Sequence, residues 1–218
     1  MAVSLRVRSG LPRQQINNSV AHNIDALRQA RRKHAANTGT LKERKRNETE
    51  QYFDKVASNS DPSIMDIDLT GNLKFLGLNA TERTKAAMAF ATNKTVETIK
   101  MIKLKLDDAC AKEFGKAIAS NTKLEKVCLD SNDFTDAGIR AILDGLGKNT
   151  SMIDMQIRHQ SKTMAIADEE GLPDLLKENK VVIKVGVYIR NPLFKTQMER
   201  KTNENRDRQR KLRNARKK

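Results

Sequence analysis

The sequence is poor in the residues that hold together small secreted proteins and aromatic cores. It has no Trp, two Tyr and two Cys among 218 residues, and aromatic residues make up 4% of the chain. Any core must therefore be built mainly from aliphatic side chains. Cys110 and Cys128 are too few for a framework of disulfides, so we expect free thiols and a cytoplasmic location. No apolar run is long enough to cross a bilayer, and the sequence predicts no membrane span.

Positive charge is in excess only at the two ends of the sequence. The net charge is +15, with 42 Lys and Arg against 27 Asp and Glu. Residues 1–50 hold 11 of the basic and 4 of the acidic residues, and residues 195–218 hold 11 and 3, which leaves 20 of each between them. Because the middle is neutral, we interpret the ends as arms that bind a polyanionic partner rather than as a general aid to solubility.

The first residues also fit a second interpretation. Residues 1–24 contain Arg6, Arg8 and Arg13 and no acid, a composition shared with organelle transit peptides. Pro12 interrupts any long amphipathic helix in this stretch. We therefore favour a basic arm over a transit peptide.

A short pattern occurs five times in the middle of the chain. An Asn, replaced by Asp at the first occurrence, is followed by three apolar residues at constant offsets. The pattern begins at Asp61, Asn93, Asn121, Asn149 and Asn179, at intervals of 32, 28, 28 and 30 residues. Self-similarity at such a period is typical of solenoids built from leucine-rich repeats. The apolar trios are Ile64, Ile67 and Leu69; Val96, Ile99 and Met101; Leu124, Val127 and Leu129; Met152, Met155 and Ile157; and Val182, Val185 and Val187.

The second half of each repeat has the apolar spacing of a helix. The clearest stripe follows Thr135 and Asp136, two residues suited to cap a helix. Pro173 is expected to mark the start of the fourth helix or a kink in it. The stripes are Ala86, Ala87 and Phe90; Phe114, Ala117 and Ile118; Ile139, Ile142, Leu143 and Leu146; and Leu172, Leu175 and Leu176.

These elements predict an α/β fold, a leucine-rich-repeat solenoid of about five strand–helix repeats. The strands should form one curved parallel sheet with the helices on its convex side, because each repeat buries its apolar face only against a neighbour. We expect a basic, partly helical arm at 1–57, the repeat domain at 58–194 and a basic C-terminal helix at 195–218. A mixed, neutral surface should cover the open face of the sheet, formed by Asp66, Asp68, Thr98, Lys100, Lys126, Cys128, Asp154, Gln156, Lys184 and Gly186.

No set of residues with catalytic or metal-binding spacing is found in the sequence. His22, His34 and His159 lack further ligands at the short intervals that zinc requires. Neither cysteine has a histidine placed to activate it, and no Gly-rich phosphate-binding loop is present. The sequence therefore predicts a protein that is not an enzyme and has no cofactor, metal or small-molecule substrate.

Three stretches carry a resemblance to a known family. Residues 59–72, 121–149 and 178–186 resemble, in order, the beginning, the central repeat and the last repeat of the leucine-rich-repeat domain of tropomodulins and leiomodins. The second stretch includes the run Leu-Asp-Ser-Asn that leads into Phe-Thr-Asp-Ala-Gly-Ile. The resemblance covers about 58–200 and implies the repeat fold and binding to actin filaments, whose pointed ends tropomodulins cap. Residues 1–57 contain no sustained heptad of the kind that pairs with a coiled coil.

Charge and resemblance together predict a scaffold or adaptor of the cytoskeleton, docked on an acidic protein filament within a larger assembly. Actin filaments and microtubules are both acidic, so actin binding and a microtubule or axonemal role, in a cilium or flagellum, both stay open. The alternative is an RNA- or ribosome-associated protein, because basic arms release counterions from phosphates. Against RNA, residues 200–218 offer no aromatic side chain to stack on bases. The predicted partner-binding residues are Arg31, Arg32, Lys33, Arg44, Lys45, Arg46, Arg206, Arg208, Arg210, Lys211, Arg213, Arg216, Lys217 and Lys218.

The C-terminal helix is expected to serve two purposes. Leu193, Phe194 and Met198 should cover the open end of the last repeat, since terminal repeats need a cap. Residues 206–218 should present the charge to a partner. On this interpretation, removing 203–218 weakens binding without unfolding the repeats.

Overall fold

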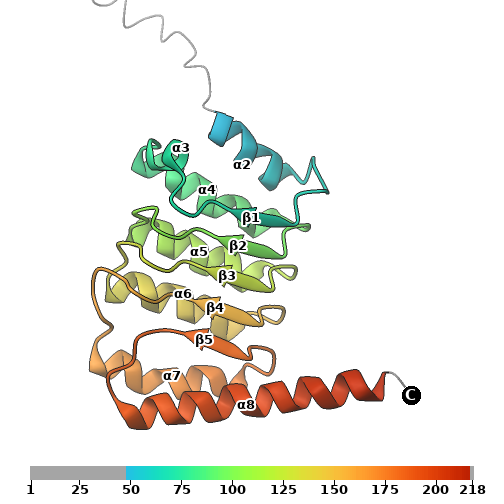
Figure 1. Cartoon of the computed structure of the whole chain (residues 1–218), viewed down its shortest axis with the longest axis vertical. Helices are drawn as coiled ribbons and strands as arrows, with labels where there is room; N and C mark the ends of the chain where they lie inside the picture. The colour runs from blue at the N-terminus through green and yellow to red at the C-terminus, as the bar shows by residue number, and fades with distance from the viewer. Residues whose placement is uncertain (1–47, 217–218) are drawn as a thin grey trace, which may run out of the picture. The chain divides into compact units, whose positions relative to one another are not determined.

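The computed structural model describes residues 48–216 (Figure 1). Its strands form one parallel sheet in the order β1-β2-β3-β4-β5. The strands are β1 (Asp66–Asp68), β2 (Thr98–Lys100), β3 (Lys126–Cys128), β4 (Asp154–Gln156) and β5 (Lys184–Gly186). The helices are α2 (Glu48–Ser58), α3 (Leu73–Leu76), α4 (Ala80–Thr92), α5 (Asp108–Ser120), α6 (Asp136–Lys148), α7 (Ile166–Glu178) and α8 (Pro192–Ala215).

Each strand is three residues long and is centred on the middle residue of an apolar trio. The central residues lie in register across the sheet, so their side chains form one column that continues from repeat to repeat. Helices α4 to α7 cover one face of the sheet and bury the predicted helical stripes against it (Figure 1). The predicted solenoid of five strand–helix repeats is confirmed. The column consists of Ile67, Ile99, Val127, Met155 and Val185.

Side chains just before α3, α4, α5 and α8 accept hydrogen bonds from the first turns of these helices. Asn79 and Glu82 form a reciprocal capping box at α4, and the Asp107 carboxylate accepts a first-turn backbone N–H at α5. Thr135 is the N-cap residue of α6 as predicted, but its side chain accepts no bond from the first turn. Its hydroxyl instead donates to the carboxylate of Asp108 on the neighbouring helix, a charge-assisted bond.

Two glycines allow α5 and α6 to touch backbone to backbone. A Cβ on Gly115 would lie 2.2 Å from the carbonyl oxygen of Ala141, and one on Gly145 would lie 2.2 Å from the carbonyl oxygen of Gly115. Real Cβ atoms do not approach this closely. The pair therefore sets the spacing between the second and third repeats.

Helix α7 contains Pro173, which was expected to mark either its start or a kink in it. Because the helix begins at Ile166, the first of these two expectations is wrong. Proline has no backbone N–H, so α7 lacks one of its internal hydrogen bonds. Leu172 and Leu176 on either side of it are buried in the core, and this packing holds the helix across the missing bond.

The recurring asparagines end the helices and shape the turn that follows. Asn93, Asn121, Asn149 and Asn179 are the C-cap residues of α4 to α7, and each is almost fully buried. The side-chain carbonyl of each accepts hydrogen bonds from the backbone N–H groups two and three residues later. These bonds turn the chain from the end of the helix toward the next strand.

The side-chain amide nitrogen of each asparagine also joins its repeat to the one before. Asn121 donates to the backbone carbonyl of Asn93 at 2.8 Å, and Asn149 donates to that of Asn121 at 2.8 Å. Asn179 continues the series with a bond of 3.0 Å to Asn149. Each nitrogen donates a second bond to a carbonyl of the preceding helix. We call this series the asparagine ladder.

The ladder does not extend to the aspartate of the first repeat. Asp61 accepts from the backbone and hydroxyl of Ser63, but a carboxylate has no N–H to donate. The first rung is instead made by Asn93, whose amide donates to the carbonyl of Val56 in α2 at 2.7 Å. Asp61 therefore shares the local turn of the repeat but not its inter-repeat bond.

Helix α2 closes the first end of the repeat stack. Phe53 and Val56 are buried, and the Phe53 ring makes edge contacts with Phe75 and Phe90. All but the last residue of this helix lie in the stretch 1–57 that the sequence assigns to the basic arm. Its apolar face packs with the repeats.

The asparagine ladder predicts that shortening one asparagine side chain strongly lowers the stability of the fold. Replacing Asn149 with Ala removes bonds to two carbonyls of the preceding repeat and to the N–H groups of Ser151 and Met152. Because these groups are shielded from water, the free energy of unfolding should fall by about 3 kcal/mol in urea denaturation. The neighbouring substitution Thr150→Ala, at an exposed residue, should change it by less than about 0.5 kcal/mol. Equal losses in the two variants would show that the ladder is not stabilising.

Candidate partner-binding surface

The last helix is fixed to the repeats by a buried carboxylate at its start. Glu169 in α7 is fully buried and accepts from the backbone N–H groups of Arg190 and Asn191 at 3.1 and 3.0 Å. The Arg190 guanidinium adds an ion pair at 3.1 Å. Asn191 then caps α8 by accepting from the backbone N–H of Leu193, and Pro192 occupies the first turn, where no N–H is required.

The pKa of Glu169 reflects this environment. Burial alone would raise the pKa of its carboxyl, but the N–H groups of Asn191 and Arg190 and the Arg190 charge outweigh burial. The pKa therefore lies below its ordinary value, and the buried group is charged at neutral pH.

One face of α8 covers the open end of the last repeat. Asn205 donates to the carbonyls of Asn179 and Val182 at 2.8 and 2.9 Å, which adds a further rung to the asparagine ladder. The Gln209 side chain donates to the carbonyl of Val181 at 2.5 Å, and the Arg206 guanidinium to that of Ile183 at 3.2 Å. The cap is therefore built from polar side chains that satisfy backbone carbonyls.

The predicted apolar cap is correct at one of its three residues. Met198 is buried, Phe194 is half-buried, and Leu193 is 60% exposed, so its predicted role is wrong. The reason is physical: the open end of a repeat exposes backbone carbonyls as well as apolar side chains, and these need donors. The cap extends to Gln209, so the prediction that 203–218 can be removed without cost to the repeats places its boundary too early.

The opposite face of α8 and its last turns carry exposed positive charge. Glu204 pairs with Arg200 and Lys201, and Asp207 pairs with Arg210. After Asp207, four exposed cations other than Arg210 have no ion pair with any residue in the described range 48–216. They form what we call the basic tip: Arg208, Lys211, Arg213 and Arg216.

Three residues of the basic tip, Lys211, Arg213 and Arg216, lie beyond the contacts that hold α8. Residues 210–216 are all exposed, and Gln209 is the last to bond the repeats. Figure 1 shows these last turns of α8 running past the end of β5. Of the predicted partner-binding residues, Arg31, Arg32, Lys33, Arg44, Lys45, Arg46, Lys217 and Lys218 lie outside the described residues.

The open face of the sheet has the mixed character predicted for it. Charges on neighbouring strands pair across the sheet, with Lys100 to Asp68 at 3.3 Å and Lys184 to Asp154 at 3.1 Å. Such exposed pairs contribute little to stability. The face offers no concentration of one charge.

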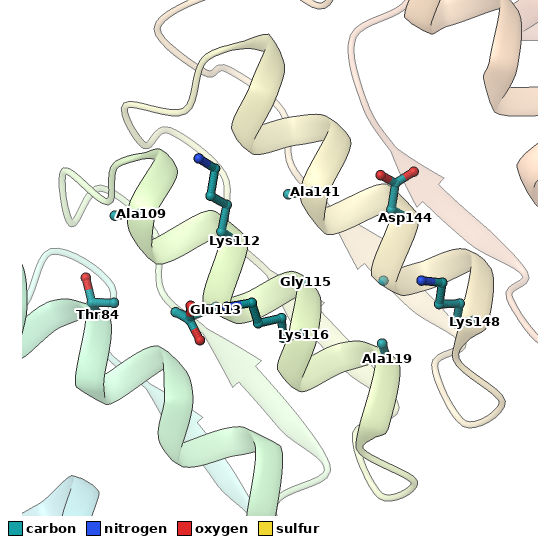
Figure 2. A pocket seen from close by; sticks show the side chains of 11 residues that line it. Thr84, Ala109, Lys112, Glu113, Gly115, Lys116, Ala119, Ala141, Asp144 and Lys148 are labelled. Carbon is teal, nitrogen blue, oxygen red and sulfur yellow. Dashed lines mark hydrogen bonds and ion pairs between the residues drawn. The ribbon is translucent and has the colours of Figure 1, made fainter.

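A shallow hollow of about 480 Å³ lies on the helix side of the repeats. Figure 2 shows Lys112 and Lys116 on α5 and Asp144 and Lys148 on α6 around it, with small residues forming its floor. Lys116 pairs with Glu113 at 2.6 Å. No side chain that lines the hollow is a cysteine or histidine, and its charges are of both signs.

The thiols are poorly suited to chemistry. Burial raises the pKa of the Cys110 thiol to about 11, and burial also raises the pKa of Cys128. Within residues 48–216, no group of three potential metal ligands is present. In the same range no helix combines the length and apolarity required to cross a membrane.

Sequence reasoning missed Glu169, Asn205 and Gln209. The sequence does contain a sign of the role of Asn205, which follows Asn179 by 26 residues, close to the repeat interval. This spacing is easily overlooked because no apolar trio follows Asn205. Nothing in the sequence indicates the role of Glu169, since its partners Arg190 and Asn191 meet it only after the chain has passed through β5.

Comparison with known proteins identifies a family. The model of the TMOD/LMOD leucine-rich domain matches residues 46–208. Leiomodin-2 of Homo sapiens is 28% identical over 164 residues, which cover 75% of this chain and 29% of leiomodin-2. Leiomodin-1 of Mus musculus is 25% identical over 139 residues, which cover 64% of this chain and 23% of that protein. The chain thus spans less than a third of the length of these relatives.

Two solved structures share the fold. The actin-binding site 2 of leiomodin-1 superposes with a TM-score of 0.70 at 22% identity, covering 76% of this chain and 93% of that one. The tropomodulin C-terminal domain of Caenorhabditis elegans also has a TM-score of 0.70, at 14% identity, with coverage of 77% and 99%. At these identities the likeness concerns the fold alone.

The buried carboxylate predicts a stability that depends on pH. Replacing Glu169 with Gln should lower the free energy of unfolding at pH 7 by about 2 kcal/mol, because Arg190 and two N–H groups lose a charged acceptor. The pKa of Glu169 is lower in the folded state than in the unfolded state, where it is about 4.3. Ionised Glu169 therefore stabilises the fold above that pH, and this stabilisation is lost as the pH falls through the lower pKa of the folded state. The difference in melting temperature between wild type and variant should therefore shrink between pH 7 and pH 3.

The exposed neighbour Glu170 provides the control, and Glu170→Gln should melt like the wild type at both pH values. A difference for Glu169→Gln that is the same at pH 7 and pH 3 would contradict this assignment.

The polar cap predicts where α8 can be shortened. Replacing Asn205 with Ala should lower the free energy of unfolding by about 2 kcal/mol, because two buried carbonyls lose their donor. Asn214→Ala, at an exposed residue on the same helix beyond the cap, is the matched control. Removing 211–218 should leave the melting temperature unchanged. A truncation as destabilising as Asn205→Ala would place the cap further along the helix.

Proposed function

The chain belongs to the TMOD/LMOD leucine-rich domain family, and from this membership we propose that it is a non-catalytic, actin-binding domain of the cytoskeleton. The observation that carries the proposal is the family match over 46–208, three quarters of the chain, since the leiomodin-1 structure with the same fold is an actin-binding site. The prediction that the chain is not an enzyme agrees with this family.

We propose that the basic tip supplies the electrostatic part of the contact. Actin filaments are acidic, and complementary charge speeds encounter and fixes orientation. The four cations of the tip project from a helix that is anchored at Glu169 and Asn205, so they are presented as a group and not on a loose tail. The basic residues of 1–46 would add to the same attraction, because they carry the same sign of charge.

The comparisons give no support to tubulin, an axonemal role or RNA. The charge of the arms alone does not distinguish these partners from actin, because every acidic polymer attracts basic arms. The family match favours actin, since most of it, over 46–208, lies on the neutral repeats and not on the arms.

Cosedimentation of the full chain with actin filaments tests the proposal. Replacing the four cations of the basic tip with Gln should weaken binding by about tenfold in low salt, because each exposed charge contributes to long-range attraction. In high salt the difference should largely disappear, since the charges are screened.

The matched control replaces four exposed lysines of the helix side with Gln, which lowers the net charge by the same amount. These residues are Lys85, Lys112, Lys148 and Lys177. We expect the control to bind like the wild type. Absence of binding by the wild type would contradict the proposed function, and an equal loss in both variants would contradict the assignment to the basic tip.

A further inference from the structure

The outer edge of the sheet remains open at β5. Strand β5 is the last strand in the sheet order, with β4 on one side. The N–H of Lys184 donates to Ile153, and the carbonyl of Gly186 accepts from Ile157, so the backbone groups of Lys184 and Gly186 point toward β4. Since alternate residues of a parallel strand direct these groups to opposite sides, those of Val185 and the following Val187 point outward.

Helix α8 lies beside this edge but bonds the backbone only before the strand begins. Its side chains bond the carbonyls of Val181, Val182 and Ile183, and the capping contacts stop there. The outward backbone groups of Val185 and Val187 have no hydrogen-bond partner among residues 48–216. Unpaired groups on an edge strand are a template for a further strand.

A groove accompanies the open edge. A hollow of about 350 Å³ runs between β5 and α8, with Ile183, Val185, Val187 and Met198 among its walls. Val185 is half-buried, whereas the residues in the same column of the sheet in the second and fourth repeats, Ile99 and Met155, are fully buried. The apolar column of the core is thus open at this end, beside unpaired backbone.

The charges around the groove select the kind of segment that fits. Lys184, Lys195 and Arg206 line it against a single acid, Glu199. Lys195 is exposed and has no ion pair within the described residues. Residues 1–50 of this chain carry an excess of positive charge, and a second copy would bring the same lysines to the edge, so both would be repelled. An acidic segment from another protein is complementary.

We propose that the groove between β5 and α8 binds an extended, acidic segment of a partner protein as a sixth strand of the sheet. Its backbone pairs with the outward groups of Val185 and Val187, as in other cases of strand addition. An apolar side chain of the segment continues the column beyond Val185, and its acidic side chains face Lys184 and Lys195. The strands of this sheet are three residues long, so a short segment is sufficient. This site is separate from the basic tip and does not depend on actin binding.

A labelled peptide of sequence Asp-Val-Asp-Val-Asp, added to the full chain, tests the proposal by fluorescence anisotropy. Val185→Pro removes the outward N–H and should weaken binding about tenfold or more. Val185→Ala loses the same side-chain packing but keeps the N–H, so it is the matched control and should bind within about threefold of the wild type. Circular dichroism of both variants checks that the repeats are folded.

A second pair of variants leaves the strand untouched. Lys195→Glu on the exposed face of α8 should weaken binding of the acidic peptide about tenfold and should strengthen binding of the charge-reversed peptide Lys-Val-Lys-Val-Lys. Lys211→Glu is the control and should change the binding of neither peptide. Equal binding of the two peptides to the wild type, or equal binding of the acidic peptide to the Lys195 and Lys211 variants, would overturn the proposal. So would concentration-dependent dimerisation that protects Val185 and Val187 from hydrogen exchange without peptide, because the edge would then be occupied by a second copy.

Discussion

The structure depends on how the buried end of each helix finds hydrogen-bond partners. A helix leaves its last carbonyls unpaired, and in a solenoid those carbonyls lie between repeats, where water does not reach. One asparagine per repeat meets this need with both halves of its amide: the oxygen holds its own turn and the nitrogen reaches the repeat before. An aspartate or a hydrophobic residue could serve at most one of these purposes. The strand register and the stacking of the helices follow from this constraint.

The same constraint explains the two ends of the stack. At the first end, α2 supplies the carbonyl that Asn93 needs and covers the core with Phe53. At the last end, Asn205 comes from a helix, not from a repeat, yet it bonds the carbonyl of Asn179 as a repeat asparagine would. The cap is therefore polar at its centre, and α8 needs little apolar surface of its own. This leaves its remaining faces free to be charged.

Anchoring and charge are combined on one helix in α8. Its first turns are held by Glu169 and its middle by Asn205 and Gln209. In its last turns Lys211, Arg213 and Arg216 have no ion pair among residues 48–216. A helix of this composition would be marginal in isolation, because helices gain most of their stability from packing. The polar cap orders it. The same geometry ends the hydrogen bonding at Ile183, and the edge at Val185 stays open as a consequence.

The sequence by itself determined the fold class, the number of repeats, the strand centres and the buried stripes, because a side chain such as Val127 or Ile142 recurs at a period that only one stacked arrangement can bury. It also indicated the family and the location of the basic residues at the end of the chain. It could not determine the bonds that depend on which groups meet in space: Thr135 with Asp108, Glu169 with Arg190, and Asn205 with Asn179. Those were decided by the tertiary structure, because a buried polar group takes the strongest partner within reach, and reach is set by the folded stack and not by distance along the chain.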